Sequence, residues 1–150
     1  MSETGDYRDV EQVVVAVDGV EETWSLEFRS RPDSWWTLIL TGSGGASWIG
    51  AGQGLWTAFL ELRRQIDPMS YKLCCAGAQV DANMRHGRWA GSDVVDILDR
   101  RTLLGFRHQE FLLAYAPAGT IGTVEEQQAR YDRWLATPWW KAFLPGDVTR

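Results

Sequence analysis

The sequence is poor in cysteine and histidine, the residues on which most transition-metal sites and many nucleophilic sites depend. Its 150 residues include only Cys74 and Cys75, together with His86 and His108. Two cysteines cannot build a disulfide framework, and adjacent strand residues point to opposite faces, so this pair is poorly placed to share a metal ion. Neither a Cys-x-x-Cys nor a His-x-x-x-His spacing occurs. We therefore expect no metal and no cofactor, with one thiol in the core and the other on the opposite face.

Long apolar runs and an excess of positive charge are also missing. No stretch of about 18 apolar residues occurs, so no membrane span is expected. The acidic start, MSETGDYRDVEQ, differs from a secretory signal, and we expect a cytoplasmic protein. The formal net charge is −5, from 20 acidic against 15 basic residues. A general nucleic-acid binder needs surplus lysine and arginine to displace counterions, so the balance disfavours nucleic acid as a partner.

Tryptophan, in contrast, is abundant, with nine residues in the chain. A small domain fills its core with some of these rings, and we assign about five or six of them to that role. Partly exposed aromatic side chains commonly anchor partner proteins. We predict that the partner-binding residues are Trp35, Trp36, Trp89, Trp139 and Trp140.

The first third of the chain has the pattern of an antiparallel meander. A branched run at Val13–Val17 is followed by Asp18-Gly19, a dipeptide that is typical of tight hairpin turns. Alternation over Thr23–Arg29 predicts a strand with one buried and one solvated face. A third strand is predicted over Trp35–Thr41.

The glycine-rich segment 42–54 invites interpretation as a phosphate-binding loop. It ends in neither Lys-Ser nor Lys-Thr, and Leu55 stands where a dinucleotide motif requires its third glycine. We therefore predict a flexible or tightly turned connector without a nucleotide.

Two helices are predicted, over residues 55–66 and 123–137. Along the first, apolar residues recur at i, i+4, i+7 and i+11 and form one continuous face. The second begins with Thr123 and Glu126, which have the spacing of a capping box.

Further strands are predicted in the second half of the chain. Residues 71–77 are apolar on both faces, which favours a central position in the sheet. The segments 93–98 and 108–117 are two more strand candidates, joined by a turn around 99–102. Residues 78–92 are predicted to form a loop.

These elements predict one α+β domain over residues 1–150. We expect an antiparallel sheet of about five to six strands, with the two main helices packed on one of its faces. The polar residues 1–11 and 145–150 are expected to be flexible ends.

The loop Ala78–Ser92 is the candidate site for a small molecule, through Asp81, Met84 and His86. Nucleophilic catalysis by Cys75 with His86 would need the fold to bring the two together, and no pattern in the sequence specifies this. We therefore name no catalytic residues.

Three segments of the chain resemble a family of small, uncharacterised bacterial proteins. In that family a Leu-x-x-Leu-Arg-like helix precedes a Leu-Cys-Asn-Gly-Ala-Arg-x-Asp-like strand and turn, and a Thr-Val-x-x-Gln…Tyr-x-x-Trp-Leu helix closes the domain. The matching residues here are FLELRRQI, then CAGAQVD from Cys75 to Asp81, a loop with Met84, Gly87 and Gly91, and finally Thr123–Gln127 with Tyr131, Trp134 and Leu135. Ala76 and Gln79 depart from the expected Asn and Arg. The resemblance implies a fold and a central loop, and no activity, because the family has no established function.

The leading hypothesis is a non-catalytic protein-binding module of adaptor or toxin-immunity type. Exposed tryptophans would supply the contacts, and the negative charge would attract a partner protein with a basic surface. One alternative is a small enzyme or small-ligand binder that uses the Ala78–Ser92 loop. Another is a structural subunit of a larger assembly, with the tryptophan pairs between protomers. Homo-oligomerisation is left open.

Overall fold

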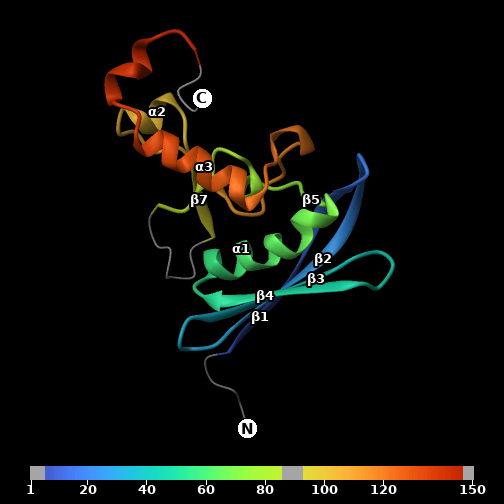
Figure 1. The fold of residues 1–150 in the computed structure, drawn as a ribbon. Coiled ribbons are helices and arrows are strands. Elements are labelled where there is room, and N and C mark those ends of the chain that lie inside the picture. The colour runs from blue at the N-terminus through green and yellow to red at the C-terminus, as the bar shows by residue number, and fades with distance from the viewer. Residues whose placement is uncertain (1–5, 86–92, 147–150) are drawn as a thin grey trace.

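The computed structural model describes residues 6–85 and 93–146, and its larger sheet is built mainly from the N-terminal third of the chain (Figure 1). This sheet is antiparallel and has five strands in the order β4-β3-β2-β1-β5. The strands are β1 (Tyr7–Val17), β2 (Val20–Ser30), β3 (Trp35–Thr41), β4 (Ser47–Gln53) and β5 (Lys72–Leu73).

A smaller sheet and the helices follow. Its three strands, in the order β6-β7-β8, are β6 (Ala82–Asn83), β7 (Val94–Ile97) and β8 (Gln109–Phe111). The α-helices are α1 (Leu55–Ile66), α2 (Arg100–Leu103) and α3 (Val124–Leu135), and short 3-10 turns are η1 (Asp67–Met69), η2 (Ala76–Ala78), η3 (Ala118–Thr120) and η4 (Trp139–Phe143). The predicted α+β class is confirmed, with α1 and α3 on the same side of the larger sheet (Figure 1). None of the helices among residues 6–85 and 93–146 has the length and apolar character that a membrane span requires.

The first hairpin is longer than the sequence pattern indicated. Asp18 and Gly19 both have positive φ angles, of 51° and 80°, as a two-residue hairpin turn requires. The strands continue well beyond the apolar run, and Tyr7 pairs with Ser30 at the far end. Residues 7–11, which were expected to be part of a flexible end, are therefore a paired strand. Most of them are polar, and none is buried, because this end of the strand lies beyond the core.

The prediction of a connector at residues 42–54 is wrong, because most of this segment is β4. Its glycines are needed for close packing between the sheet and α1. A Cβ atom on Gly50 would lie 2.3 Å from the backbone nitrogen of Leu62 and 2.4 Å from the carbonyl oxygen of Ala58. Gly50 therefore lets the helix backbone rest directly on the strand, a requirement that hydrophobic periodicity does not reveal.

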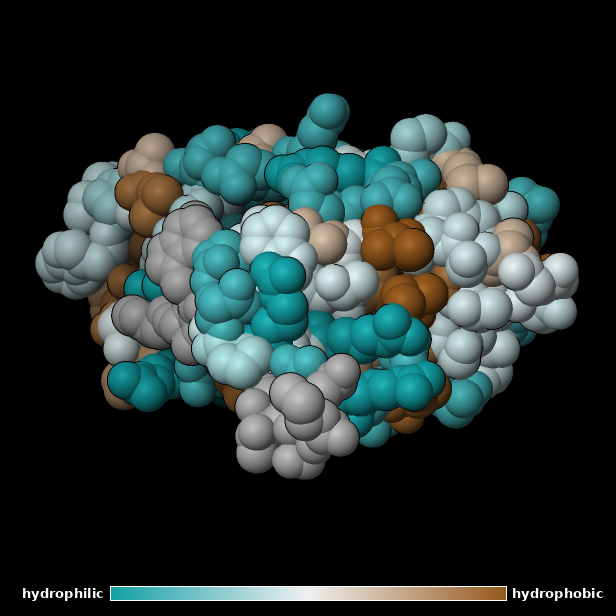
Figure 2. Space-filling view, turned by 90° about the horizontal axis from the view of Figure 1, so that it is seen from below, coloured by the Kyte–Doolittle hydropathy of each residue, from teal (hydrophilic) through white to brown (hydrophobic). Residues whose placement is uncertain are grey.

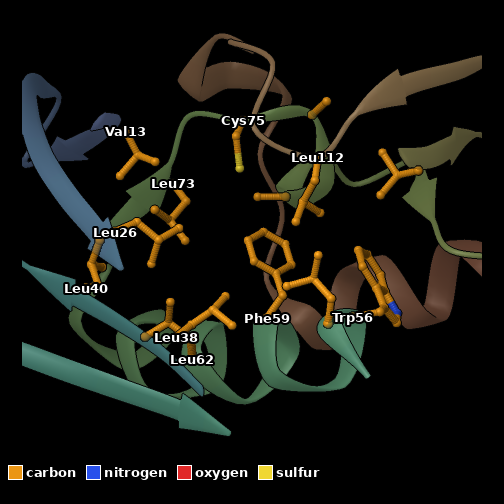
Figure 3. Packing of buried hydrophobic residues seen from close by; sticks show 14 of the residues in the cluster. Val13, Leu26, Leu38, Leu40, Trp56, Phe59, Leu62, Leu73, Cys75 and Leu112 are labelled. Atoms are coloured by element: carbon orange, nitrogen blue, oxygen red, sulfur yellow. The ribbon is translucent and has the colours of Figure 1, made fainter. Parts of the chain in front are cut away.

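The hydrophobic core lies between the larger sheet and α1 (Figure 3). Strands β2 and β3 contribute Leu26, Leu38 and Leu40, which are fully buried. Phe59 and Leu62 project from α1 toward them, as the spacing of the apolar residues predicted. No helix or strand among residues 6–85 and 93–146 covers the opposite face of the sheet, which is mostly hydrophilic (Figure 2).

The segment around the two cysteines joins the two halves of the fold. Strand β5 is an edge strand of only two residues, so the predicted central position is wrong for the regular strand. Its continuation, however, is hydrogen-bonded on both sides. The Cys74 amide donates to the Val14 carbonyl (2.8 Å), and the Cys74 carbonyl accepts from the Ala116 amide (3.1 Å). Around Cys74, the segment 72–77 therefore fills a slot between β1 and residues 112–116.

Two further expectations need correction. The predicted turn at 99–102 is the short helix α2, which Asp99 caps through the amides of Arg101 and Thr102. The predicted strand at 108–117 has regular pairing only over β8. Beyond it the chain leaves β7 and bonds to the cysteine segment, with Gly77 donating to the Leu112 carbonyl (2.9 Å).

Candidate functional site

A groove of about 610 Å³ opens between the N-terminal half of β1 and residues 111–114. Its walls combine acidic, aromatic and aliphatic side chains. The lining residues are Tyr7, Asp9, Glu11, Phe28, Ser30, Trp36, Leu55, Asp93, Phe111, Leu112, Leu113 and Ala114.

The groove exists because β1 is longer than its neighbour on this side. Strand β5 pairs with β1 only at Val15 and Ala16. Within the described residues, no strand pairs with the same edge over residues 7–12. The slot that residues 72–77 fill farther along β1 is therefore open at this end.

Three carboxylates give the groove its charge. Alternation along β1 turns Asp9 and Glu11 to the same face as Tyr7, and Asp93 belongs to the opposite wall. The Tyr7 hydroxyl donates to Asp9 Oδ2 (3.3 Å). Burial raises the pKa of Tyr7, and the negative charges of Asp9, Glu11 and Asp93 raise it further. All three acids therefore act on one hydroxyl, and among residues 6–85 and 93–146 no lysine, arginine or histidine lines the groove.

Aromatic rings lie beside these carboxylates. The rings of Tyr7 and Trp36 are 6.0 Å apart between centroids, and Phe28 is buried behind them. Phe111, on the other wall, is 67% exposed. Carboxylates beside aromatic faces are well suited to a guanidinium group, which binds both.

The tryptophans predicted to bind a partner do not form one surface. Trp36 lines the groove, whereas its neighbour Trp35 points to the uncovered sheet face, where Arg31 lies 5.7 Å from its ring centroid. Trp139 and Trp140 are on η4, which lies beside α2 and far from the N-terminal end of β1 (Figure 1). They are exposed there, as are Phe143 and Leu144. Trp89 lies outside the described residues.

The structure describes two of the three residues predicted for a small-molecule site. Met84 is 1% exposed and belongs to the core, so its side chain is not at the surface. Asp81 is half-buried, and its carbonyl accepts from the Leu98 amide (2.8 Å), which joins the loop to the end of β7. His86 lies outside the described residues.

The cysteines have a structural environment. Cys75 belongs to the core cluster and Cys74 does not, in agreement with the expected opposite faces, although both are buried. Burial raises the pKa of the Cys75 thiol to about 11 and also raises the pKa of Cys74. Neither thiol is activated as a nucleophile.

A histidine-carboxylate pair that the sequence interpretation missed lies beside α2. His108 Nδ1 is 2.5 Å from Asp99 Oδ2, and His108 Nε2 is 3.8 Å from Glu110 Oε1. Asp99 also caps α2, so the pair holds β8 against this helix. A sequence signal was present, because Asp99 and Thr102 have capping-box spacing.

The segments that carry the family resemblance meet in a buried polar junction. Arg63 from α1 donates to Gln127 Oε1 (2.6 Å) and to the Gly122 carbonyl (2.7 Å). Gln127 Nε2 then donates to the carbonyls of Gly77 and Gln79, at 2.9 and 2.8 Å. The first helix, the CAGAQVD turn and the last helix are thus fastened together, which gives these residues a structural role.

No known protein-family model matches this chain, and no curated protein is significantly similar to it. The resemblance to uncharacterised bacterial proteins therefore stays a prediction, and the candidate site depends on its geometry.

Proposed function

We propose that this protein is a non-catalytic binding module of adaptor or toxin-immunity type, and that its acidic groove binds a basic segment of a partner protein. One observation carries the proposal: three carboxylates and two exposed aromatic rings line the same open groove, and no basic side chain lines it within the part of the chain that the structure describes. Negative charges gathered in one groove attract a cationic ligand and disfavour an anionic one.

The charge of the whole chain supports the same partner. A net charge of −5 produces a field that attracts a basic protein, and complementary fields raise association rates. A nuclease toxin, whose surface must be basic to bind nucleic acid, is a partner of this chemistry. The exposed Phe111 and half-buried Trp36 supply the apolar contacts that charge steering alone does not provide.

The experiment compares affinity capture by three forms of the tagged protein from lysate of its source organism. The groove variant is Asp9→Asn/Glu11→Gln/Asp93→Asn. The control variant is Asp18→Asn/Glu125→Gln/Asp132→Asn, whose three positions are exposed and line no part of the groove. Each variant lacks three of the 20 acidic charges of the wild type. The two variants therefore have the same net charge and differ only in where the charge was removed.

We expect a basic protein to be retained by the wild type and the control variant and lost by the groove variant. Equal capture by both variants would contradict the groove as the docking site. Failure of the wild type to retain any protein would contradict the binding-module proposal itself.

A further inference from the structure

We infer that the partner segment binds as an added β-strand on the free edge of β1, with arginine or lysine at alternate positions. This inference rests on the proposed function and specifies the shape and sequence pattern of what the groove binds.

The direction of the backbone groups in β1 supports strand addition. In an antiparallel sheet the N–H and C=O of one residue point to the same edge. The Val14 carbonyl accepts from Cys74 on the β5 side, so even-numbered residues of β1 point to that side and odd-numbered residues bond to β2. Arg8, Val10 and Gln12 therefore direct their backbone groups along the groove. The Val10 amide is consistent with this, because it donates to the Asp9 side chain (2.9 Å).

The fold already contains a strand in the equivalent position. Cys74 bonds to Val14 of β1 on one side and to Ala116 on the other, so at this point the spacing between the two walls accommodates one extended chain. The groove continues this slot past residues 7–12. Six residues at about 3.3 Å each span about 20 Å, enough for an added strand of about six residues.

The side chains of β1 dictate what the added strand must carry. Tyr7, Asp9 and Glu11 face the groove, and neighbouring strands place their side chains in rows on the same face. Alternate residues of the incoming strand would therefore lie between these acids and the wall formed by Phe111 and Asp93. Arginine fits this environment, since its guanidinium pairs with carboxylates and stacks on aromatic rings.

The same acids disfavour a second copy of this chain as the occupant. Pairing β1 with β1 of another copy would place Asp9 and Glu11 of each edge close to those of the other, and like charges on neighbouring strands are destabilising. Charged side chains on edges are a common defence against self-association. An oppositely charged strand meets no such barrier.

The test uses fluorescein-labelled Arg-Val-Arg-Thr-Arg-Val and measures binding by fluorescence anisotropy at low ionic strength. The glutamate version of the peptide serves as the charge control. Two further peptides carry N-methyl groups on alternate backbone nitrogens, one on the arginines and one on the intervening residues. Hydrogen exchange of the β1 amides is followed with and without the parent peptide.

We expect the arginine peptide to bind, the glutamate peptide not to bind, and at least one methylated peptide to bind about tenfold more weakly or worse. The amides of Arg8, Val10 and Gln12 should exchange more slowly with peptide bound, while the odd-numbered amides, already paired with β2, should change little.

The outcomes separate this inference from the proposed function. If the parent peptide binds and needs the groove carboxylates, but methylation has no effect and the even-numbered amides stay unprotected, strand addition is wrong and the acidic groove stands. If the parent peptide does not bind, or binds the groove variant as well as the control variant, both are wrong. A dimer that protects these amides without peptide would assign the edge to a second copy and overturn the inference.

Discussion

The Arg63 junction and the acidic groove are both clusters of polar groups, and they differ in how their charges are satisfied. At the junction, Arg63 and Gln127 are 2% and 1% exposed, and they bond to backbone carbonyls from two segments of the chain, the turn at Gly77–Gln79 and Gly122. In the groove, three acids line an open surface, and none of the described residues that line it is basic. The first cluster holds the fold together, whereas the second is the surface that we propose binds a basic partner. Stability and binding should therefore depend on different residues.

The largest effect on stability is expected at Arg63. The Arg63→Ala variant leaves Gln127 Oε1 and the Gly122 carbonyl without their donor and opens a cavity beside Phe59, so we expect a loss of about 3 kcal/mol in the free energy of unfolding. Arg64→Ala is the matched control, because Arg64 is exposed and pairs only with Glu61 at the surface, and it should cost under about 0.5 kcal/mol. Urea unfolding measures both. Equal losses of unfolding free energy in the two variants would contradict the structural role of the buried Arg63.

The next largest effect is expected at Gln127. The Gln127→Ala variant leaves the carbonyls of Gly77 and Gln79 and one Arg63 donor unsatisfied, which should cost about 2 kcal/mol. Its neighbour Gln128 is exposed and reaches only Asp132 (3.0 Å) on the same helix, so Gln128→Ala should cost under about 0.5 kcal/mol. Thermal unfolding of the pair checks this. A destabilisation by Gln128→Ala as large as that by Gln127→Ala would contradict it.

The groove variant should show the opposite behaviour. Removing the charges of Asp9, Glu11 and Asp93 should change the free energy of unfolding by less than about 0.5 kcal/mol, because these side chains are at the surface. The same change should lower the pKa of Tyr7 toward its ordinary value of 10.0, since part of its upward shift comes from these acids. Spectrophotometric or NMR titration against the control variant tests this. An unchanged Tyr7 pKa would show that the three acids do not act together.

The smallest effect is expected at Asp99, which is less buried than the Arg63 junction and less exposed than two of the three groove acids. Partial burial raises the pKa of Asp99, but the hydrogen bond from His108, the Thr102 amide and the charge of Arg101 outweigh it, so the pKa lies below its ordinary value of 3.8. A lowered pKa stabilises the fold at pH values above 3.8, and this contribution is lost as the pH falls through the lower folded value. At neutral pH the free energy of unfolding of the wild type should therefore exceed that of Asp99→Asn by about 0.5–1 kcal/mol, and this difference should disappear in acid. Urea unfolding of both proteins at several pH values measures this difference. A difference that does not change with pH would show that the charge of Asp99 is not its cause.

Much of the fold was predictable because local chemistry specifies it. The Asp18-Gly19 turn, the capping box at Thr123 and the apolar face of α1 each determine a local structure, and all three are present. The strand nature of residues 47–53 was not predictable, because Gly50 is required by a helix that packs against it only in the folded protein.

The groove was harder to predict for a similar reason. Asp9 and Glu11 lie in a polar stretch that has no apolar periodicity, and the opposite wall at Asp93 and Phe111 is roughly 80 to 100 residues away in sequence. Only the shortness of β5 leaves the slot open. The sequence did identify Trp36 as a partner-binding candidate, and the structure places it in the groove while Trp139 and Trp140 lie elsewhere.

Whether the acidic groove is the binding site can be tested most directly by an NMR titration. It follows the indole N–H signals of the ¹⁵N-labelled protein as the arginine peptide is added. The Trp36 signal reports on the groove, and the Trp139 and Trp140 signals report on η4, so one experiment distinguishes the two surfaces. Binding in the groove should shift the Trp36 signal and leave those of Trp139 and Trp140 unchanged, and the shift should be lost in the groove variant. A shift confined to Trp139 and Trp140 would contradict this prediction and move the binding site to η4.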